Sequence, residues 1–269
     1  MVEAPERYRS ILPTDTAWTP VASGESGAGV FRSADGSRYA KCVVDQDVPA
    51  LDGERERLVW AGAHDIPCAP VLDWHAGAGI ACLVTGTVPG VTAETLSADE
   101  LGRAWASIAD AVRRLHETPT ADCPFDRGVA RMFALAQDVV ARDAVHPEFL
   151  PEEQVGTPPA VLLARLAARI DARLAQERAN AVVCQGDLCL PNIVVDPATD
   201  TVTGFLDLGR LGTADPYADI ALLLASSRET WPDEPSAAKA DRDFAHRYGL
   251  TLDSERLRFY LHLDPLTWG

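Results

Sequence analysis

The chain has 269 residues, of which 47% are hydrophobic and 24% are charged. This length allows a large core and predicts one enzyme built from two lobes. The formal net charge of -16 argues against nucleic acid as a partner, because phosphate backbones are bound by basic surfaces. The charge permits a polycationic partner without establishing one, since acidity also opposes aggregation.

The six cysteines form no C-x-x-C pair, and several lie in apolar runs. This pattern favours free thiols in a reducing cytoplasm over disulfides or a zinc site. The first residues lack the basic and apolar regions of a signal peptide, and no apolar run reaches transmembrane length. We therefore expect a cytoplasmic protein with no membrane segment, and a monomer by default.

Short strands are predicted over residues 17–45. A glycine-rich segment, 24–29, precedes the first apolar strand, and Asp35-Gly36 marks a turn into a second strand over 38–44. Together these signals predict a β-hairpin with a glycine-rich loop before it.

A helix is predicted over 50–63, where apolar residues alternate with charges, and a short apolar strand over 81–84. The segment 85–90 ends in Pro-Gly, a turn signal. We take this segment as the hinge between an N-terminal lobe, 1–86, and a C-terminal lobe, 87–269.

The pattern becomes helical from Ser97, which has capping-box spacing to Glu100. Apolar residues then recur at steps of three and four, so one face is expected to be buried. These residues are Leu101, Trp105, Ile108, Val112 and Leu115.

A second helix is predicted from Thr157-Pro158, with Thr157 as its cap and Pro158 in its first turn. Its inner face is expected to carry Leu163, Leu166, Ile170 and Leu174. The later predicted elements are a buried strand over 181–184, a hairpin of strands 193–195 and 202–206, and a buried helix beyond Ala218.

Three oxygen-bearing side chains lie on the predicted loops at the ends of these strands. Asp187 precedes Asn192 by five positions, and Asp207 follows Asn192 by fifteen. This spacing is typical of a kinase-like site, in which one acid orients the attacking hydroxyl and two oxygens hold Mg²⁺ against the phosphates of ATP.

The segment 204–221, GFLDLGRLGTADPYADIA, resembles the metal-binding motif of the aminoglycoside phosphotransferases. Within that family the chain most resembles the streptomycin 3''-phosphotransferases, over nearly its whole length, including segments 24–27, 123–127 and 259–269. The resemblance implies an α+β, bilobal, protein-kinase-like fold. Its N-lobe is an antiparallel sheet plus a helix, and its C-lobe is mostly helical.

The resemblance also implies roles for individual residues. Asp187 matches the catalytic aspartate, which accepts a hydrogen bond from the attacking hydroxyl. Asn192 and Asp207 match the ligands of Mg²⁺. One position departs from the family, which usually has histidine where this chain has Gln185. An amide is also a neutral donor and acceptor, so the loop can still be braced, with altered geometry.

The nucleotide is expected to contact the N-lobe. Lys41 resembles the kinase lysine that binds the α- and β-phosphates, with Glu54 as its implied ion-pair partner and Glu56 as the alternative. The glycine-rich loop is interpreted as presenting the backbone N–H groups of Ser26 and Gly27 to phosphate oxygens.

The segment 85–88 matches the hinge that binds adenine, through the C=O of Gly86 and the N–H of Val88. The resemblance implies streptomycin as the small-molecule substrate, phosphorylated at its 3''-hydroxyl with resistance to the antibiotic as the result. Carboxylates are natural partners for its guanidinium groups. Candidate substrate contacts are Glu229, Trp231, Asp233, Glu234 and Asp264.

Two other functions remain open. One is a kinase of another small-molecule alcohol; a protein kinase is disfavoured, because no Ala-Pro-Glu segment follows Asp207. The other is a non-catalytic nucleotide-binding module, which Gln185 suggests and the intact Lys41, Asp187, Asn192 and Asp207 oppose.

Overall fold

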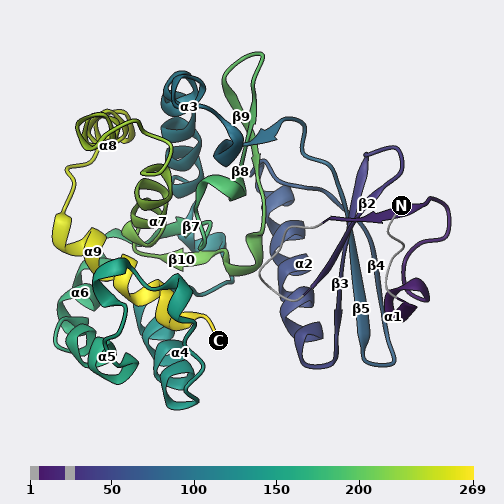
Figure 1. The fold of residues 1–269 in the computed structure, drawn as a ribbon, viewed down its shortest axis with the longest axis horizontal. Coiled ribbons are helices and arrows are strands. Elements are labelled where there is room, and N and C mark those ends of the chain that lie inside the picture. Colours follow the sequence, from purple (N-terminus) through teal and green to yellow (C-terminus); the bar gives the residue numbers. More distant parts are fainter. Residues whose placement is uncertain (1–5, 22–27) are drawn as a thin grey trace. The chain divides into compact units, whose positions relative to one another are not determined.

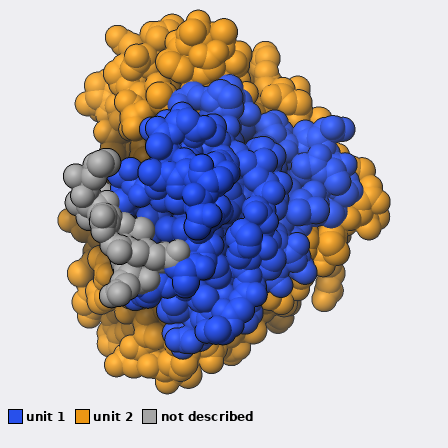
Figure 2. All heavy atoms as spheres, turned by 90° about the vertical axis from the view of Figure 1, so that its right-hand side faces the viewer, with its two compact units in different colours: residues 1–90, 203–209 blue, residues 91–202, 210–269 orange. Residues whose placement is uncertain are grey.

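The computed structural model describes residues 6–21 and 28–269 of the chain. The chain forms two compact units, coloured separately in Figure 2. Unit 1 comprises residues 1–90 and 203–209, and unit 2 comprises residues 91–202 and 210–269. None of the helices in the described ranges combines the length and apolarity that crossing a membrane requires.

Unit 1 contains an antiparallel sheet with the strand order β1-β2-β3-β5-β4 (Figure 1). Its strands are β1 (Trp18–Pro20), β2 (Gly29–Ser33), β3 (Arg38–Val44), β4 (Val71–Gly77) and β5 (Ile80–Gly86). Its helices are α1 (Glu6–Arg9), the 3-10 turn η1 (Asp45–Asp47) and α2 (Val48–Ala63).

The alternation of side chains along β3 decides what each face of this sheet packs against. Ala40 and Cys42 point into a small core that also contains Tyr8, Phe31 and Val84. Lys41 lies between them in the chain and therefore points to the other face, where its ammonium group meets α2. The central strand β3 thus places a cation against helix α2.

Unit 2 is mostly helical. Its helices are α3 (Ala98–His116), α4 (Val129–Ala141), α5 (Pro159–Ala167), α6 (Ile170–Asn180), α7 (Tyr217–Ser227), α8 (Glu234–Tyr248) and α9 (Ser254–Leu263). Its 3-10 turns are η2 (Ala93–Thr95), η3 (Thr120–Asp122), η4 (Pro147–Phe149), η5 (Glu152–Gln154), η6 (Leu190–Asn192) and η8 (Asp264–Thr267). A further turn, η7 (Leu208–Arg210), spans the unit boundary.

Two small sheets hold the loops between these helices. In one, β7 (Val182–Cys184) pairs antiparallel with β10 (Gly212–Ala214). The other has the order β6-β8-β9, formed by β6 (Val91–Thr92), β8 (Ile193–Asp196) and β9 (Thr201–Phe205). The main core of the unit lies among α4, α5, α7 and α9, with Met132, Leu162, Phe259 and Leu263 among its buried residues.

The architecture confirms the α+β, kinase-like fold class predicted from the sequence. Ser97 caps α3 with a complete capping box, as expected. The Ser97 side chain accepts a hydrogen bond from the N–H of Glu100, and the Glu100 side chain accepts one from the N–H of Ser97. The hairpin of β2 and β3 and the strand pair β8–β9 also form where they were predicted.

The predicted helix from Thr157 is wrong in its start and in its length. Proline at 159 forces Pro158 into an extended conformation (φ -55°, ψ 133°), so α5 begins at Pro159 and Thr157 makes no cap. The helix then ends at Ala167, and α6 begins at Ile170. The predicted inner face is confirmed: Leu166 is buried in the core of unit 2, and Leu163, Ile170 and Leu174 pack against it partly buried, with Leu162 as a further buried residue.

Candidate active site

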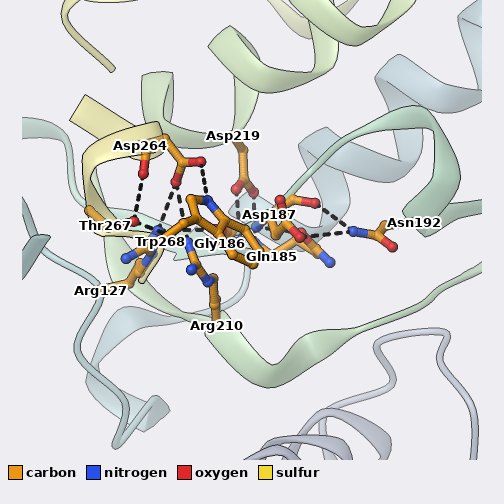
Figure 3. Close-up of polar contacts among 10 residues, drawn as sticks. All are labelled: Arg127, Gln185, Gly186, Asp187, Asn192, Arg210, Asp219, Asp264, Thr267 and Trp268. Carbon is orange, nitrogen blue, oxygen red and sulfur yellow. Dashed lines mark hydrogen bonds and ion pairs between the residues drawn. The ribbon is translucent and has the colours of Figure 1, made fainter. Parts of the chain in front are cut away.

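The loop that carries Asp187 is fixed by hydrogen bonds to its backbone (Figure 3). β7 ends at Cys184, and the next two N–H groups, of Gln185 and Gly186, donate to the Asp219 carboxylate at 2.6 Å and 2.8 Å. Gly186 has a φ of +92°, and a Cβ on it would lie 2.1 Å from the Arg210 carbonyl oxygen. Only glycine fits this position, which brings the loop directly against Arg210.

Asp187 itself is held from both sides. Its N–H donates to the side-chain oxygen of the fully buried Gln185 at 2.7 Å. From the other side, the Asn192 amide nitrogen donates to the Asp187 carbonyl oxygen at 2.9 Å and to its carboxylate at 3.2 Å. Gln185 therefore braces the loop through its amide, at the position where the resembling family usually has histidine.

Asp219 anchors this loop from the first turn of α7 and is fully buried. Its carboxylate also meets the Nε2 atom of His116 at 3.1 Å, while Nδ1 of the same ring lies 2.7 Å from the Tyr248 hydroxyl. Sequence reasoning assigned no role to Asp219 in the site. The sequence does contain a signal for this role. Asp219 stands at the start of a very apolar helix, so its carboxylate is expected to be buried and to need hydrogen-bond donors.

In unit 1, the Lys41 ammonium lies 2.7 Å from Oε2 of Glu54, on α2, and 3.6 Å from Oδ1 of Asp207. The structure thus pairs Lys41 with Glu54. Glu56 is exposed, and its carboxylate lies 3.9 Å from Arg55 instead. Burial opposes the charge on Lys41, but Glu54 and Asp207 outweigh burial and raise the pKa of the ammonium above its usual value.

Asp207 follows β9, in the segment 203–209 that belongs to unit 1. The N–H of Phe205 donates to the Pro67 carbonyl at 2.8 Å, which ties the segment to this unit. Asp207 has a positive φ of 50°, and half of its side chain is exposed (51%). The Asp207 carboxylate is thus partly open to solvent on a residue whose backbone conformation few side chains adopt.

The predicted site residues fall into two groups, one in each unit. Lys41, Glu54 and Asp207 meet in unit 1, and Asp187 and Asn192 meet in unit 2. The predicted phosphate-binding residues Ser26 and Gly27 lie outside the described residues.

The predicted hinge begins where β5 ends. The N–H of Gly86 donates to the Pro70 carbonyl at 2.9 Å, and the N–H of Thr87 donates to the Ser37 carbonyl at the same distance. Val88, the second predicted adenine contact, is half-buried.

Most of the predicted substrate contacts already have partners within unit 2. Asp233 caps α8 by accepting the N–H of Ser236 at 2.9 Å. Glu234 lies 3.0 Å from Arg228. The Trp231 indole N–H lies 3.2 Å from Ser227 Oγ, and its ring meets Trp105 edge-on.

The remaining two contacts differ sharply in burial. Glu229 is exposed, whereas Asp264 is 6% exposed and bound by Arg127 and by the Trp268 indole N–H.

Each unit holds an oxygen-bearing side chain of the type that a hard cation such as Mg²⁺ takes as a ligand. Asp207 offers an exposed carboxylate, and Asn192 engages Asp187 through its amide nitrogen. This contact does not involve the amide oxygen of Asn192, which is a ligand atom of the type that Mg²⁺ takes.

Together, these features define a kinase-like phosphotransferase, and comparison with known families agrees. The model of the phosphotransferase enzyme family matches residues 17–260. The chain belongs to this family, as its resemblance predicted.

Individual relatives are similar over nearly the whole chain. A streptomycin 3''-kinase of Streptomyces griseus is 60% identical over 252 residues, covering 94% of this chain and 93% of the relative. An aminoglycoside 3'-phosphotransferase of Streptomyces fradiae is 39% identical over 260 residues, covering 92% of this chain and 94% of the relative.

Solved structures give the same result. The aminoglycoside phosphotransferase APH(3'')-Id of Streptomyces rimosus matches with a TM-score of 0.92 at 61% identity, covering 95% of this chain and 94% of that chain. A structure of that protein in complex with ADP and streptomycin matches with a TM-score of 0.90 at 60% identity, with the same coverage.

Proposed function

We propose that this chain transfers the γ-phosphoryl group of ATP to the 3''-hydroxyl of streptomycin, with Mg²⁺ as cofactor, and so confers resistance to the antibiotic. The observation that carries the proposal is the braced Asp187, whose carboxylate and backbone are both held by Asn192. The similarity to a streptomycin 3''-kinase and to a structure holding ADP and streptomycin supports the choice of substrate.

Asp187 would act mainly by positioning. Its carboxylate accepts a hydrogen bond from the attacking hydroxyl and directs that oxygen at the γ-phosphorus. Phosphoryl transfer through a loose transition state needs little covalent help from the protein, so the rigidity supplied by Gln185, Asn192 and Asp219 is what the reaction uses.

Lys41 would bind the α- and β-phosphates, with Glu54 fixing the position of its ammonium group. Asn192 and Asp207 would hold the Mg²⁺ ion, which neutralises charge on the phosphates when bound. The N–H groups of Ser26 and Gly27 would meet phosphate oxygens.

The hinge at 85–90 would bind adenine through the backbone of Gly86 and Val88. On this reading the lobe 1–86 binds nucleotide, and the lobe 87–269 carries the catalytic aspartate and the substrate.

Streptomycin carries two guanidinium groups, which pair with carboxylates in a planar, bidentate geometry. Among the candidate acids Glu229 is exposed and Glu234 is held only at the surface. Contact of Glu229, Trp231, Asp233 or Glu234 with the substrate stays a prediction, as do the cytoplasmic location and the monomeric state. Asp264 is committed to Arg127 and Trp268, so its contribution would be indirect.

The test is a product analysis with purified protein, ATP and Mg²⁺. Streptomycin should gain one phosphate by mass spectrometry, and NMR should place that phosphate on the 3''-hydroxyl. Kanamycin, which has a 2-deoxystreptamine core, should remain unmodified. Asp187→Asn, which preserves the shape of the side chain, should lower kcat by about 10²–10⁴-fold while the protein stays folded.

Each alternative gives a different outcome. ATP consumption with other alcohols but not with streptomycin would favour another small-molecule kinase. Nucleotide binding without turnover on any acceptor would favour a non-catalytic module. An Asp187→Asn variant with full kcat would contradict the role of Asp187.

A further inference from the structure

We propose that Arg127 is a positioning residue for the catalytic aspartate, and that the C-terminal segment 264–268 anchors it in this role. The inference rests on the proposed phosphotransfer function and adds a part of the molecule outside its kinase-like motifs. All of the residues concerned lie in unit 2. Figure 3 shows the side chains of Arg127, Asp264 and Trp268 beside the catalytic loop.

Backbone hydrogen bonds fix the position of Arg127 independently of its side-chain contacts. Its N–H donates to the Thr213 carbonyl at 3.0 Å, and the N–H of Thr213 donates to the Phe125 carbonyl at 2.9 Å. Segment 125–127 therefore runs beside β10, the partner of β7, and β7 leads into the catalytic loop. This pairing brings Arg127 next to that loop from a distant part of the sequence.

The guanidinium group is buried beside the catalytic loop. Arg127 is only 6% exposed, and its Nη2 atom lies 3.0 Å from Oδ1 of Asp264 and 3.5 Å from the carbonyl oxygen of Gly186. Gly186 immediately precedes Asp187, so this long contact reaches the peptide group that sets the direction of the catalytic residue. Within the described residues, the Nε atom of Arg127 is buried and has no hydrogen-bond partner.

The C-terminal segment supplies the counter-ion. Oδ2 of Asp264 accepts the Trp268 indole N–H at 2.9 Å, which leaves Oδ1 to face Arg127. Arg210 also approaches Oδ1, at 3.5 Å, and its guanidinium carbon lies 3.4 Å from the centre of the Trp268 ring. Trp268 thus orients the carboxylate and stacks on a second cation.

The Arg127 guanidinium group lies among several charged groups. Two guanidinium groups share the single carboxylate of Asp264. Burial lowers the pKa of Arg127, while Asp264, Asp187 and Asp219 oppose that effect. The charge of Arg127 is therefore coupled to the catalytic loop as well as to Asp264, which a simple stabilising ion pair with the C-terminal segment does not require.

The experiment compares Arg127→Met and Arg127→Lys with a matched control, Arg173→Met. Arg173 is also a buried arginine of unit 2 (4% exposed) with an unpartnered Nε, but it contacts Gln176, Glu255 and the Phe259 ring. Arg173→Met therefore measures how much stability and activity the protein loses when any buried guanidinium group is removed. For each variant, kcat, the KM for ATP, the KM for streptomycin and the thermal midpoint are measured.

We expect Arg127→Met to lower kcat by about 10–10²-fold, as a displaced reacting group does, with the KM for ATP within about twofold of the parent. Arg210 and Trp268 still hold Asp264 in this variant, so the protein should fold. Arg127→Lys should recover part of kcat, since an ammonium keeps the charge but does not place its donors where the Nη2 atom of Arg127 meets both partners. Arg173→Met should lose stability without loss of kcat.

Several outcomes would overturn the proposal. A folded Arg127→Met with parental kcat would do so, as would equal losses of kcat in Arg127→Met and Arg173→Met. If Arg127→Met does not fold, Arg127→Lys becomes the test of the positioning role. Parental kcat in Arg127→Lys would then count against the proposal. A parent protein that does not phosphorylate streptomycin would instead refute the proposed function, so the two failures are distinguishable.

Discussion

Replacing Gly186 by alanine tests whether the close approach of the catalytic loop to Arg210 is essential. The added Cβ would lie 2.1 Å from the Arg210 carbonyl oxygen and 2.5 Å from its carbonyl carbon. Real Cβ contacts are essentially never below 3.0 Å, so the loop or Arg210 must move by about 1 Å. Two backbone segments meet here, and neither can swing aside as a flexible side chain would.

The expected loss of stability has two parts. A non-glycine residue in the left-handed region costs about 1–2 kcal/mol, and forcing an extra carbon into a packed site costs about 1–3 kcal/mol. Gly249 provides the matched control, because it has a φ of +95° but nothing within 4 Å of an added Cβ. Gly249→Ala should therefore lose only the first part, and Gly186→Ala about 2–5 kcal/mol in all.

The assay is urea denaturation of both variants and the parent, followed by circular dichroism, with kcat measured well below each transition. Gly186→Ala should be less stable than Gly249→Ala, and its kcat should fall by about 10²-fold because Asp187 moves with the loop. Gly249→Ala should keep the parental kcat. If Gly186→Ala matches Gly249→Ala in both stability and kcat, the rigid contact with Arg210 does not position Asp187.

Three further variants test the proposed roles. Asp207→Ala should abolish Mg²⁺-dependent binding of ADP in calorimetry, and tight metal-dependent binding in that variant would place the ligand elsewhere. Lys41→Arg should lose ATP affinity and kcat, because a planar fork does not fit the point contact that an ammonium makes beside Glu54; equal kinetics would mean that Lys41 is only structural. Gln185→His should remain active, since an imidazole nitrogen can accept the N–H of Asp187. A folded but inactive Gln185→His would show that the loop requires an amide.

Local rules predicted much of the fold because the relevant signals lie close together in the sequence. The capping box of Ser97 and Glu100 is three residues wide, and it formed as expected. Asp233, whose contact with the substrate stays a prediction, also carries a local signal: an aspartate before Glu-Pro is typical of a helix N-cap, which it makes in the structure.

Other features depend on contacts between distant segments and had no local signal. Strand β4 was not predicted, because it lies at the edge of its sheet and is mostly exposed, so it lacks the apolar pattern of β5. The burial of Arg127 follows from pairing with β10 and from the carboxylate of Asp264, and neither is adjacent in sequence. The position of Asp187 could be taken from its motif, but its hydrogen-bond partners could not.

The division of the chain has a consequence for the order in which the protein is made on the ribosome. Residues 203–209 belong to unit 1 but are synthesised only after the whole of 91–202. Until then the nascent unit 1 lacks the bond from Phe205 to Pro67 and the approach of Asp207 to Lys41. We therefore expect a fragment of residues 1–90 to be incomplete on its own, and the N-terminal unit to finish folding late in translation although it emerges first.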